Sequence, residues 1–346
     1  MGALSHAQRG GIDPGGSGRN AAVLRLDQPL WTGGRITSVI DAASRRLDAA
    51  AAGVDEARLE MALRVLAAYL EALRQKGREE HATANAQEHE RLLAMIQRRV
   101  TQEVSSQTDQ RLAESRLQLA RHDLSQARQS LRGALAQLSQ LSDGSVGAVG
   151  WEGLEDPAGP PSLDAALAAA LDASPTLRRL AHEEQAAEAA IAQRKSAVLP
   201  RVSLRVERVT GGGFPADSRA LLVLQAQPGA GLSAHSGVQE AVARREAAHQ
   251  ARAAGERDLR ERIALDWEEW IAARGRSEAA RLSSTMSAEV FASYARQYVA
   301  GRKSWQEVLN AVREATQANF LLEDARAQAA GAAMRLRAQT GMLTTR

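Results

Sequence analysis

Apolar residues in the first part of the chain follow the spacing of a long helix that packs against another helix. A proline-free stretch begins near Thr37 and ends near Val100. At about 1.5 Å per residue it predicts a helix of roughly 95 Å, which few globular domains could contain. Its leucines step by four and three residues, as in a coiled-coil seam: Leu59, Leu63, Leu66, Leu70 and Leu73.

A second helical pattern follows a turn near Ser105 and Ser106. There, leucines recur every seven residues with alanines between them, so large side chains alternate with small ones that let helices approach closely. We interpret the two segments as one antiparallel hairpin in a first repeat at 21–142, with its tip near 101–108. The recurring residues are Leu117, Leu124, Leu131 and Leu138, with Ala113, Ala120, Ala127 and Ala134.

The second half of the chain repeats this organisation after a Gly- and Pro-rich connector at 143–162. A helix from Leu163, interrupted near Ser174 and Pro175, precedes two strands and a second long hairpin. We therefore expect a second repeat at 163–346. Within it, the strands are expected at about 201–210 and 219–227, and the hairpin at about 237–340 with its tip near 299–305.

The two expected strands alternate apolar and polar residues. Val202, Leu204 and Val206 are separated by polar side chains, and the segment after the Gly-rich loop alternates in the same way. A length of about ten residues with one apolar and one polar face is what a tilted membrane strand requires. A soluble hairpin has the same alternation, and the strands alone favour it.

Composition and charge agree with long helices and exclude several classes of function. Of the 346 residues 44% are hydrophobic but 3% are aromatic, which suits thin helix-on-helix packing better than a thick core. The 44 basic and 41 acidic residues are interspersed, without the basic stripe that nucleic-acid binding needs. Absence of cysteine excludes disulfides and thiolate metal sites. No apolar run reaches the length of about 18 residues that a transmembrane helix needs.

Catalytic, metal and cofactor chemistry finds no support in the sequence, and we predict that the protein is not an enzyme. The seven histidines are scattered, and the nearest pair, His81 and His89, has the spacing of surface helix positions. Adjacent glutamates on a helix point in different directions and cannot form a carboxylate pair. The glycines at 10–18 lack the Lys-Ser/Thr ending of a phosphate loop.

The repeat also makes a prediction about the start of the chain. The two repeats match at two places. A Gln-Pro pair ends a strand before a long helix in each, at Gln28-Pro29 and at Gln227-Pro228. At the tips, Ser106 aligns with Lys303, so Leu112 aligns with Leu309. The second repeat carries a helix and a strand before its Gln-Pro pair. We therefore expect that residues 1–20 are a Gly-rich loop or strand remnant, and that a helix, most of a strand and a signal peptide belong upstream of Met1 or were lost by truncation.

Three segments resemble the TolC-like outer membrane factor family of efflux and secretion proteins. The segment from Gln28 to Arg35 looks like its strand-to-helix junction, where proline stops the strand and two glycines turn the backbone. Tyr298 to Leu309 resembles its periplasmic hairpin tip, and Ala166 to Thr210 is a third match. In this order and spacing they identify the chain as a family member, apparently truncated at its N-terminus.

The resemblance implies a fold and a function. The fold would be mainly α with a small β part: two long antiparallel coiled-coil hairpins plus about three membrane strands that contribute to a trimeric α/β-barrel duct. The protein would be the outer membrane channel of a tripartite efflux or type I secretion system, with its helical part in the periplasm. It would be a passive exit duct for an inner membrane ABC or RND-type pump. Its partners would be two further copies, a periplasmic adaptor and outer membrane lipid, without nucleic acid or cofactor.

The resemblance also implies two kinds of functional residue. We expect a strand-to-helix junction at Gln28, Pro29, Leu30, Trp31, Gly33, Gly34, Gln227 and Pro228. We expect adaptor-contacting tips at Val104, Ser106, Gly301, Arg302, Ser304 and Trp305, with Trp305 exposed at the tip. The first tip has Gln102-Glu103 where the family prefers glycine.

The alternative from another class is a soluble coiled-coil scaffold that binds partner helices. It has no use for two alternating strands between residues 201 and 227, whereas a membrane channel does. A membrane-surface amphipathic helix is disfavoured because the seams are narrow and the faces carry both signs of charge.

Overall fold

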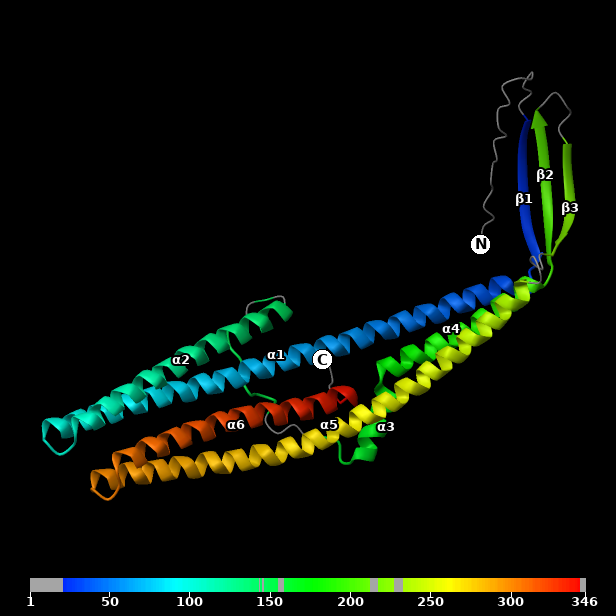
Figure 1. Ribbon diagram of the computed structural model, residues 1–346. Helices are drawn as coiled ribbons and strands as arrows, with labels where there is room; N and C mark the ends of the chain where they lie inside the picture. Colours follow the sequence, from blue (N-terminus) through cyan, green and yellow to red (C-terminus); the bar gives the residue numbers. More distant parts are fainter. Residues whose placement is uncertain are drawn as a thin grey trace. The chain divides into compact units, whose positions relative to one another are not determined.

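The computed structural model of the protein describes residues 21–142, 144, 146–154, 159–211, 217–226 and 233–342 (Figure 1). The expected mainly helical fold with a small β part is confirmed. No helix in these residues is both long and apolar enough to cross a membrane. The elements are β1 (Ala21–Trp31), α1 (Arg35–Thr101), α2 (Gln107–Leu141), α3 (Leu163–Ala173), α4 (Pro175–Val198), β2 (Arg201–Gly211), β3 (Asp217–Gln225), α5 (Ser233–Val299) and α6 (Trp305–Gln339).

The two hairpins have the same dimensions. α1 and α5 are 67 residues each, and α2 and α6 are 35 residues each. Ser106 caps α2 and Ser304 caps α6, so these two serines are equivalent. The expected pairing of Ser106 with Lys303, and of Leu112 with Leu309, is therefore wrong by one residue. Leucines that step by three and four do not distinguish alignments one residue apart, whereas a helix cap does.

The chain divides into two units, each with segments of both repeats. The strand unit comprises Met1–Val54 and Pro175–Glu256, and the hairpin unit comprises Asp55–Ser174 and Arg257–Arg346. The long helices α1 and α5 each begin in the strand unit and end in the hairpin unit.

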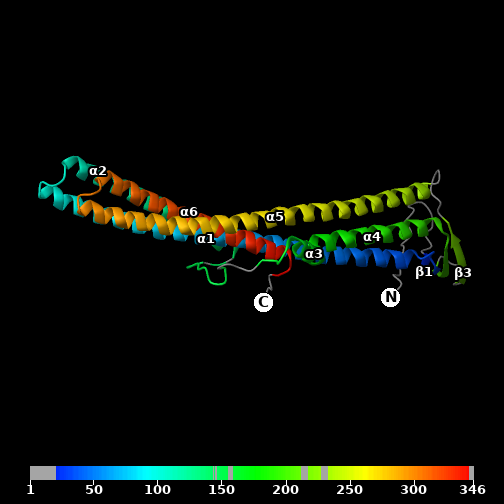
Figure 2. The ribbon, with the colours of Figure 1, turned by 90° about the horizontal axis from the view of Figure 1, so that it is seen from below.

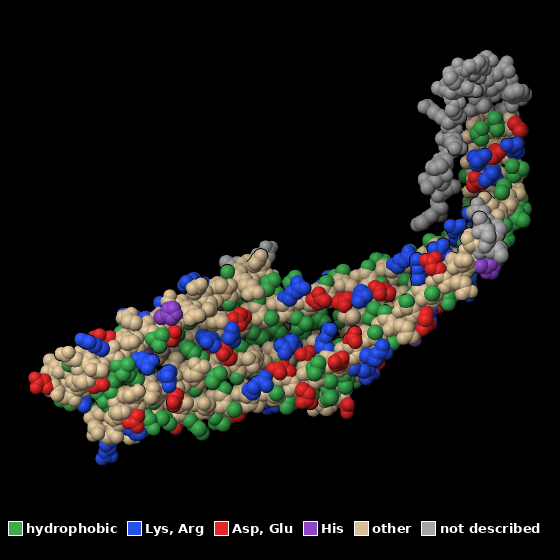
Figure 3. Space-filling model, in the orientation of Figure 1, with side chains coloured by type: hydrophobic (Ala, Val, Ile, Leu, Met, Phe, Trp, Pro, Cys, Tyr) green, Lys and Arg blue, Asp and Glu red, His purple; other side chains and the backbone are tan. Residues whose placement is uncertain are grey.

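The strand unit contains an antiparallel sheet in the order β1-β2-β3. Charged side chains lie next to one another on the face of the strands that Figure 3 shows. Helix α4 packs against α5, where a Cβ on Gly255 would lie 2.7 Å from Cδ1 of Leu180. Glu184 of α4 accepts hydrogen bonds from His249 at 2.9 Å and from Arg252 at 3.3 Å. The seam between these helices is thus close-packed and ion-paired.

The described part of the hairpin unit includes two apolar clusters that join its helices, the first of which contains residues of the predicted seams. One contains Leu70, Leu73 and Leu138 together with Val149 of the connector. The other lies next to the tips and contains Leu92, Ile96 and Val308 among others. Helix α6 runs beside α1 in both ribbon views (Figures 1 and 2), and alanines make up much of its buried surface. Small residues allow two helices to approach closely.

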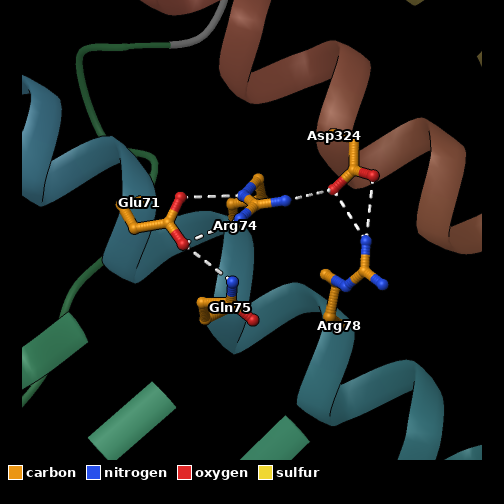
Figure 4. Close-up of polar contacts among 5 residues, drawn as sticks. All are labelled: Glu71, Arg74, Gln75, Arg78 and Asp324. Carbon is orange, nitrogen blue, oxygen red and sulfur yellow. Dashed lines mark hydrogen bonds and ion pairs between the residues drawn. The ribbon is translucent and has the colours of Figure 1, made fainter. Parts of the chain in front are cut away.

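Ion pairs connect α1 and α6 across this close approach (Figure 4). Asp324 of α6 accepts from Arg74 at 2.9 Å and from Arg78 at 2.9 Å. Arg74 also donates to Glu71, and this hydrogen bond, with the one to Asp324, raises the pKa of its guanidinium. These groups are about one-quarter to two-fifths exposed, so solvent screens the pairs and their main effect is on the register of the two helices.

One glycine in α1 makes room for a buried carboxylate of α6. Glu323 is buried, and its closest polar partner is His81 at 3.4 Å. A Cβ on Gly77 would lie 2.3 Å from Oε2 and 2.8 Å from Cγ of Glu323. The glycine therefore gives the Glu323 side chain its space, and any larger residue there must displace that side chain.

We expect Gly77→Ala to be about 1–3 kcal/mol less favourable to the free energy of unfolding than Gly133→Ala, because its methyl group gains the same helix propensity but displaces the Glu323 side chain. Gly133 of α2 is the matched control, since its Cβ would meet nothing within 4 Å. Gly133→Ala should therefore stabilise by about 0.5–1 kcal/mol. Thermal unfolding followed by circular dichroism measures both changes. Equal effects of the two substitutions would contradict the packing role of Gly77.

Candidate functional site

The strand-to-helix junction turns on two glycines with left-handed backbone. Gly33 has φ +60° and Gly34 has φ +81°, values that other residues rarely adopt. A Cβ on Gly33 would lie 2.9 Å from Cβ of Leu199, which leaves no room for a side chain. The hydroxyls of Thr37 and Ser38 donate to the carbonyl oxygen of Gly34 at 2.8 and 2.9 Å, and so tie the first turn of α1 to the junction.

The predicted junction residues Gln28, Pro29, Leu30 and Trp31 form the end of β1. Pro29 sits opposite Ser203, and the pairing shifts by one residue between Pro29 and Trp31. Proline is tolerated because β1 is an edge strand among the described strands. Gln227 and Pro228 lie outside the described residues.

One face of the sheet carries a network of ion pairs. Glu207 of β2 accepts from Arg25 of β1 at 2.7 Å and from Arg219 of β3 at 2.9 Å. Arg205, two residues before Glu207, donates to Asp27 of β1 at 2.7 Å. Side chains two residues apart share a face of a strand, so all these groups lie on the same side of the sheet.

The opposite face is mostly apolar and uncovered, although Arg208 lies on it in the row of Leu24 and Ser218. Its register rows combine Leu26 with Val206 and Ala220, Gln28 with Leu204 and Leu222, and Trp31 with Val202 and Leu224. The large apolar side chains of this face stay exposed in the single chain: Leu24, Leu26, Trp31, Leu204, Val206, Leu222 and Leu224. A contiguous apolar face of this kind marks a surface that another apolar phase or molecule covers. The register thus places the predicted apolar residues of β2 and β3 on one face, whereas Leu221 and Val223 of β3 lie on the charged face.

The two hairpin tips share one capping design. Ser106 and Ser304 each accept a hydrogen bond from the backbone N–H three residues on, and the acidic side chain there accepts one from the serine backbone. Gly301 has φ +73°, as the predicted tight turn requires. At the equivalent place in the first tip Glu103 adopts φ +60°, which is strained for a residue with a side chain.

The expectation that Trp305 is exposed at the second tip is wrong, because its side chain is 4% exposed. Its ring packs against Tyr298, with centroids 5.3 Å apart, in the cluster that includes Leu92 and Val308. Trp305 is the first residue of α6, and a side chain at that place can fold back beneath the turn. It therefore supports the tip from within instead of being presented on it.

The outer surface of the tips is formed by the other predicted residues. Val104, Ser106, Gly301, Arg302 and Ser304 are exposed, Val104 to 59%. The structure brings the two turns together, since the hydroxyls of Ser105 and Tyr298 lie 3.3 Å apart. That these residues contact an adaptor stays a prediction.

Sequence reasoning missed three aromatic and charged contacts beneath the tips. The Arg99 guanidinium lies 4.9 Å from the Tyr298 ring, and Nζ of Lys303 lies 4.2 Å from the Tyr294 ring. Lys303 also donates to Glu307 at 2.6 Å; with the hydrogen bonds from Ser304, this lowers the pKa of Glu307 to about 2. The signal was available: in a chain with 3% aromatic residues, two tyrosines and a tryptophan fall within 294–305.

Comparison with known proteins gives a family-model match over part of the chain and a shared fold. A family model described as outer membrane efflux protein matches residues 1–144. No curated protein is detectably similar in sequence.

Several solved structures share the fold over 98% of the chain. A membrane protein from Pseudomonas aeruginosa superposes with a TM-score of 0.80 at 20% identity, over 80% of its own chain. The outer membrane protein VceC from Vibrio cholerae gives 0.79 at 14% identity, over 86% of its chain. The open state of the MtrE outer membrane channel from Neisseria gonorrhoeae gives 0.78 at 20% identity, over 80% of its chain.

The two tip turns generate a reciprocal prediction. Glu103→Gly should raise the free energy of unfolding by about 1 kcal/mol, because glycine adopts the left-handed conformation without the steric penalty. Gly301→Ala should lower the free energy of unfolding by a similar amount, because alanine pays the steric penalty of the left-handed conformation that glycine avoids. Chemical denaturation of the two variants beside the wild type measures the changes. Destabilisation by Glu103→Gly would show that the glutamate side chain, and not the backbone, decides the conformation of the first turn.

Proposed function

We propose that the chain is a member of the TolC-like outer membrane efflux protein family and that it is the exit duct of a tripartite efflux or type I secretion system. In this role it is a passive channel, and an inner membrane pump of the ABC or RND type drives the cargo into it. The sheet lies in the outer membrane and the helical hairpins lie in the periplasm.

The observation that carries this proposal is the two-faced sheet. A lipid bilayer covers an apolar face and leaves the charged face to an aqueous interior, which is the arrangement of membrane strands. A soluble coiled-coil scaffold would leave Leu222 and Leu224 exposed to water without benefit. The uncovered apolar face therefore favours the channel over the scaffold.

The sheet also supports assembly into a homotrimer. Among the described strands β1 and β3 are edges, each with backbone groups that lack a neighbouring strand. In lipid, an unpaired backbone N–H or C=O costs several kcal/mol, so strands from other copies must pair with these edges. Three copies around a common axis satisfy this need and surround an interior with the ion-paired faces.

The hairpin tips are the proposed contact with a periplasmic adaptor. Val104, Arg302 and Ser304 form an exposed surface on turns that the buried Trp305 holds in shape. Under this proposal Trp305 acts by supporting the turns, and the exposed residues make the contact. The junction at Gly33 and Gly34 has a different role, which is to join the membrane strand to the periplasmic helix.

Membrane insertion is tested by matched substitutions on the two faces of β3. Leu222→Asp places a charge on the apolar face, and we expect loss of the heat-sensitive trimer from the outer membrane fraction, because a charge facing lipid costs up to about 2–4 kcal/mol in each copy. Val223 is the neighbouring residue on the charged face. Val223→Asp should leave the trimer in place. If both variants fractionate like the wild type, the sheet does not contact lipid.

Adaptor contact is tested at the tips with the full chain. Val104→Asp together with Arg302→Glu reverses the chemistry of the exposed surface, and we expect strongly reduced cross-linking to the adaptor with normal trimer formation. Leu119→Asp is the control, since Leu119 is exposed on α2 at a distance of several turns from the tip. Unchanged cross-linking of the tip variant, or an equal loss in the control, would contradict the assignment.

A further inference from the structure

The charged face of the sheet presents its arginines and hides its central carboxylate. The Glu207 side chain is 5% exposed, whereas those of Arg25 and Arg219 are 48% and 57% exposed. A third arginine also lies near this carboxylate, since Nε of Arg205 is 4.0 Å from Oε1 of Glu207. Each guanidinium has five N–H donors, so the hydrogen bonds to Glu207 leave donors that face outward. The surface that a solute meets is therefore guanidinium.

The charge balance of this face agrees with its exposure. Its two central rows contain three arginines and two carboxylates, which leaves one positive charge in excess. These residues are Arg25, Arg205 and Arg219, with Asp27 and Glu207. Repeated in several copies around an interior with low-dielectric walls, this excess raises the local concentration of anions.

A cavity of about 480 Å³ lies at the foot of the same face, within the strand unit. One part of its wall carries the cations Arg35, Arg201 and Arg205 together with the carboxylate of Asp27, to which Arg205 donates at 2.7 Å, so cations exceed carboxylates there. Another part is apolar and comes from the first turns of α1, with Ile36, Val39 and Ile40.

Arg35 does not stabilise the helix on which it lies. It is the first residue of α1, whose first turn contains no acidic residue. A cation at a helix N-terminus is unfavourable to the helix. The cavity thus combines an unfavourably placed cation with an apolar surface, a combination that fits a molecule with an anionic head and an apolar body.

From these observations we infer that the sheet interior is an anion-favouring passage and that the cavity at its foot binds amphipathic organic anions as cargo. The inference rests on the proposed function, because it needs the charged face to line a duct. It names the substrate class that the duct wall prefers: carboxylates, sulfates or sulfonates with an apolar body. Arginine suits such head groups because its planar fork binds their oxygens in pairs.

The passage is tested by the reversal potential of the full chain in a planar lipid bilayer under a potassium chloride gradient. We expect the sign of an anion-preferring pore. Arg219→Gln should move the potential towards zero, and Arg219→Glu should move it further towards cation preference. The matched control is Arg208→Gln, since Arg208 is on β2 but on the opposite face, in the row of Leu24 and Ser218.

The cavity is tested in the same bilayers with decanesulfonate and with an alkylammonium of equal chain length. We expect decanesulfonate to block the current at lower concentration than the ammonium. Arg35→Gln should raise the blocking concentration about tenfold, as for loss of one charge-assisted hydrogen bond. Arg46→Gln is the control, because Arg46 lies on the same helix but outside this cavity.

The outcomes separate this inference from the proposed function. Absence of pores and of a heat-sensitive trimer would overturn the proposed function and the inference with it. Pores that prefer cations, or whose reversal potential is the same in Arg219→Glu and wild type, would overturn the inference alone. Equal block by the two amphiphiles, unchanged by Arg35→Gln, would overturn the cavity as a cargo site.

Discussion

Between Trp31 and Arg35 the backbone must change from a strand with a two-residue period to a helix with a 3.6-residue period, and the rest of the strand unit depends on how it does so. The change is made at Gly33 and Gly34, both left-handed, with Gly33 held against Leu199. Leu199 comes just before Pro200 and β2, so this contact connects the end of β1 to the start of its partner strand. A slip of one residue would exchange the faces of β1 and bring Arg25 and Asp27 to the apolar side.

The hairpin unit solves a different problem, which is how helices with narrow apolar seams stay in register. Alanine-rich surfaces of α6 allow close approach to α1, but small residues alone specify register weakly. Two polar contacts exist at only one alignment of the two helices. Asp324 accepts from Arg74 and Arg78, and Glu323 lies against Gly77. Register is thus set by polar side chains at positions that apolar packing leaves ambiguous.

Local periodicity made most of the fold predictable from sequence, and side-chain direction limited the rest. The proline-free leucine patterns predicted α1, α2, α5 and α6, and alternation predicted the faces of β2 and β3. The double glycine predicted the turn before α1. Periodicity could not predict the burial of Trp305, because a ring at a hairpin tip can point outward or fold beneath the turn. The ion pair of Arg74 with Asp324 joins residues 250 apart, and no spacing rule connects them.

Glu103 and Gly301 occupy equivalent turns with the same sign of φ but different chemistry. Since each hairpin has its own copy of the turn, a substitution in one leaves the other intact, and the two copies are free to diverge. Duplication therefore gives selection two independent places at which to adjust one end of the molecule.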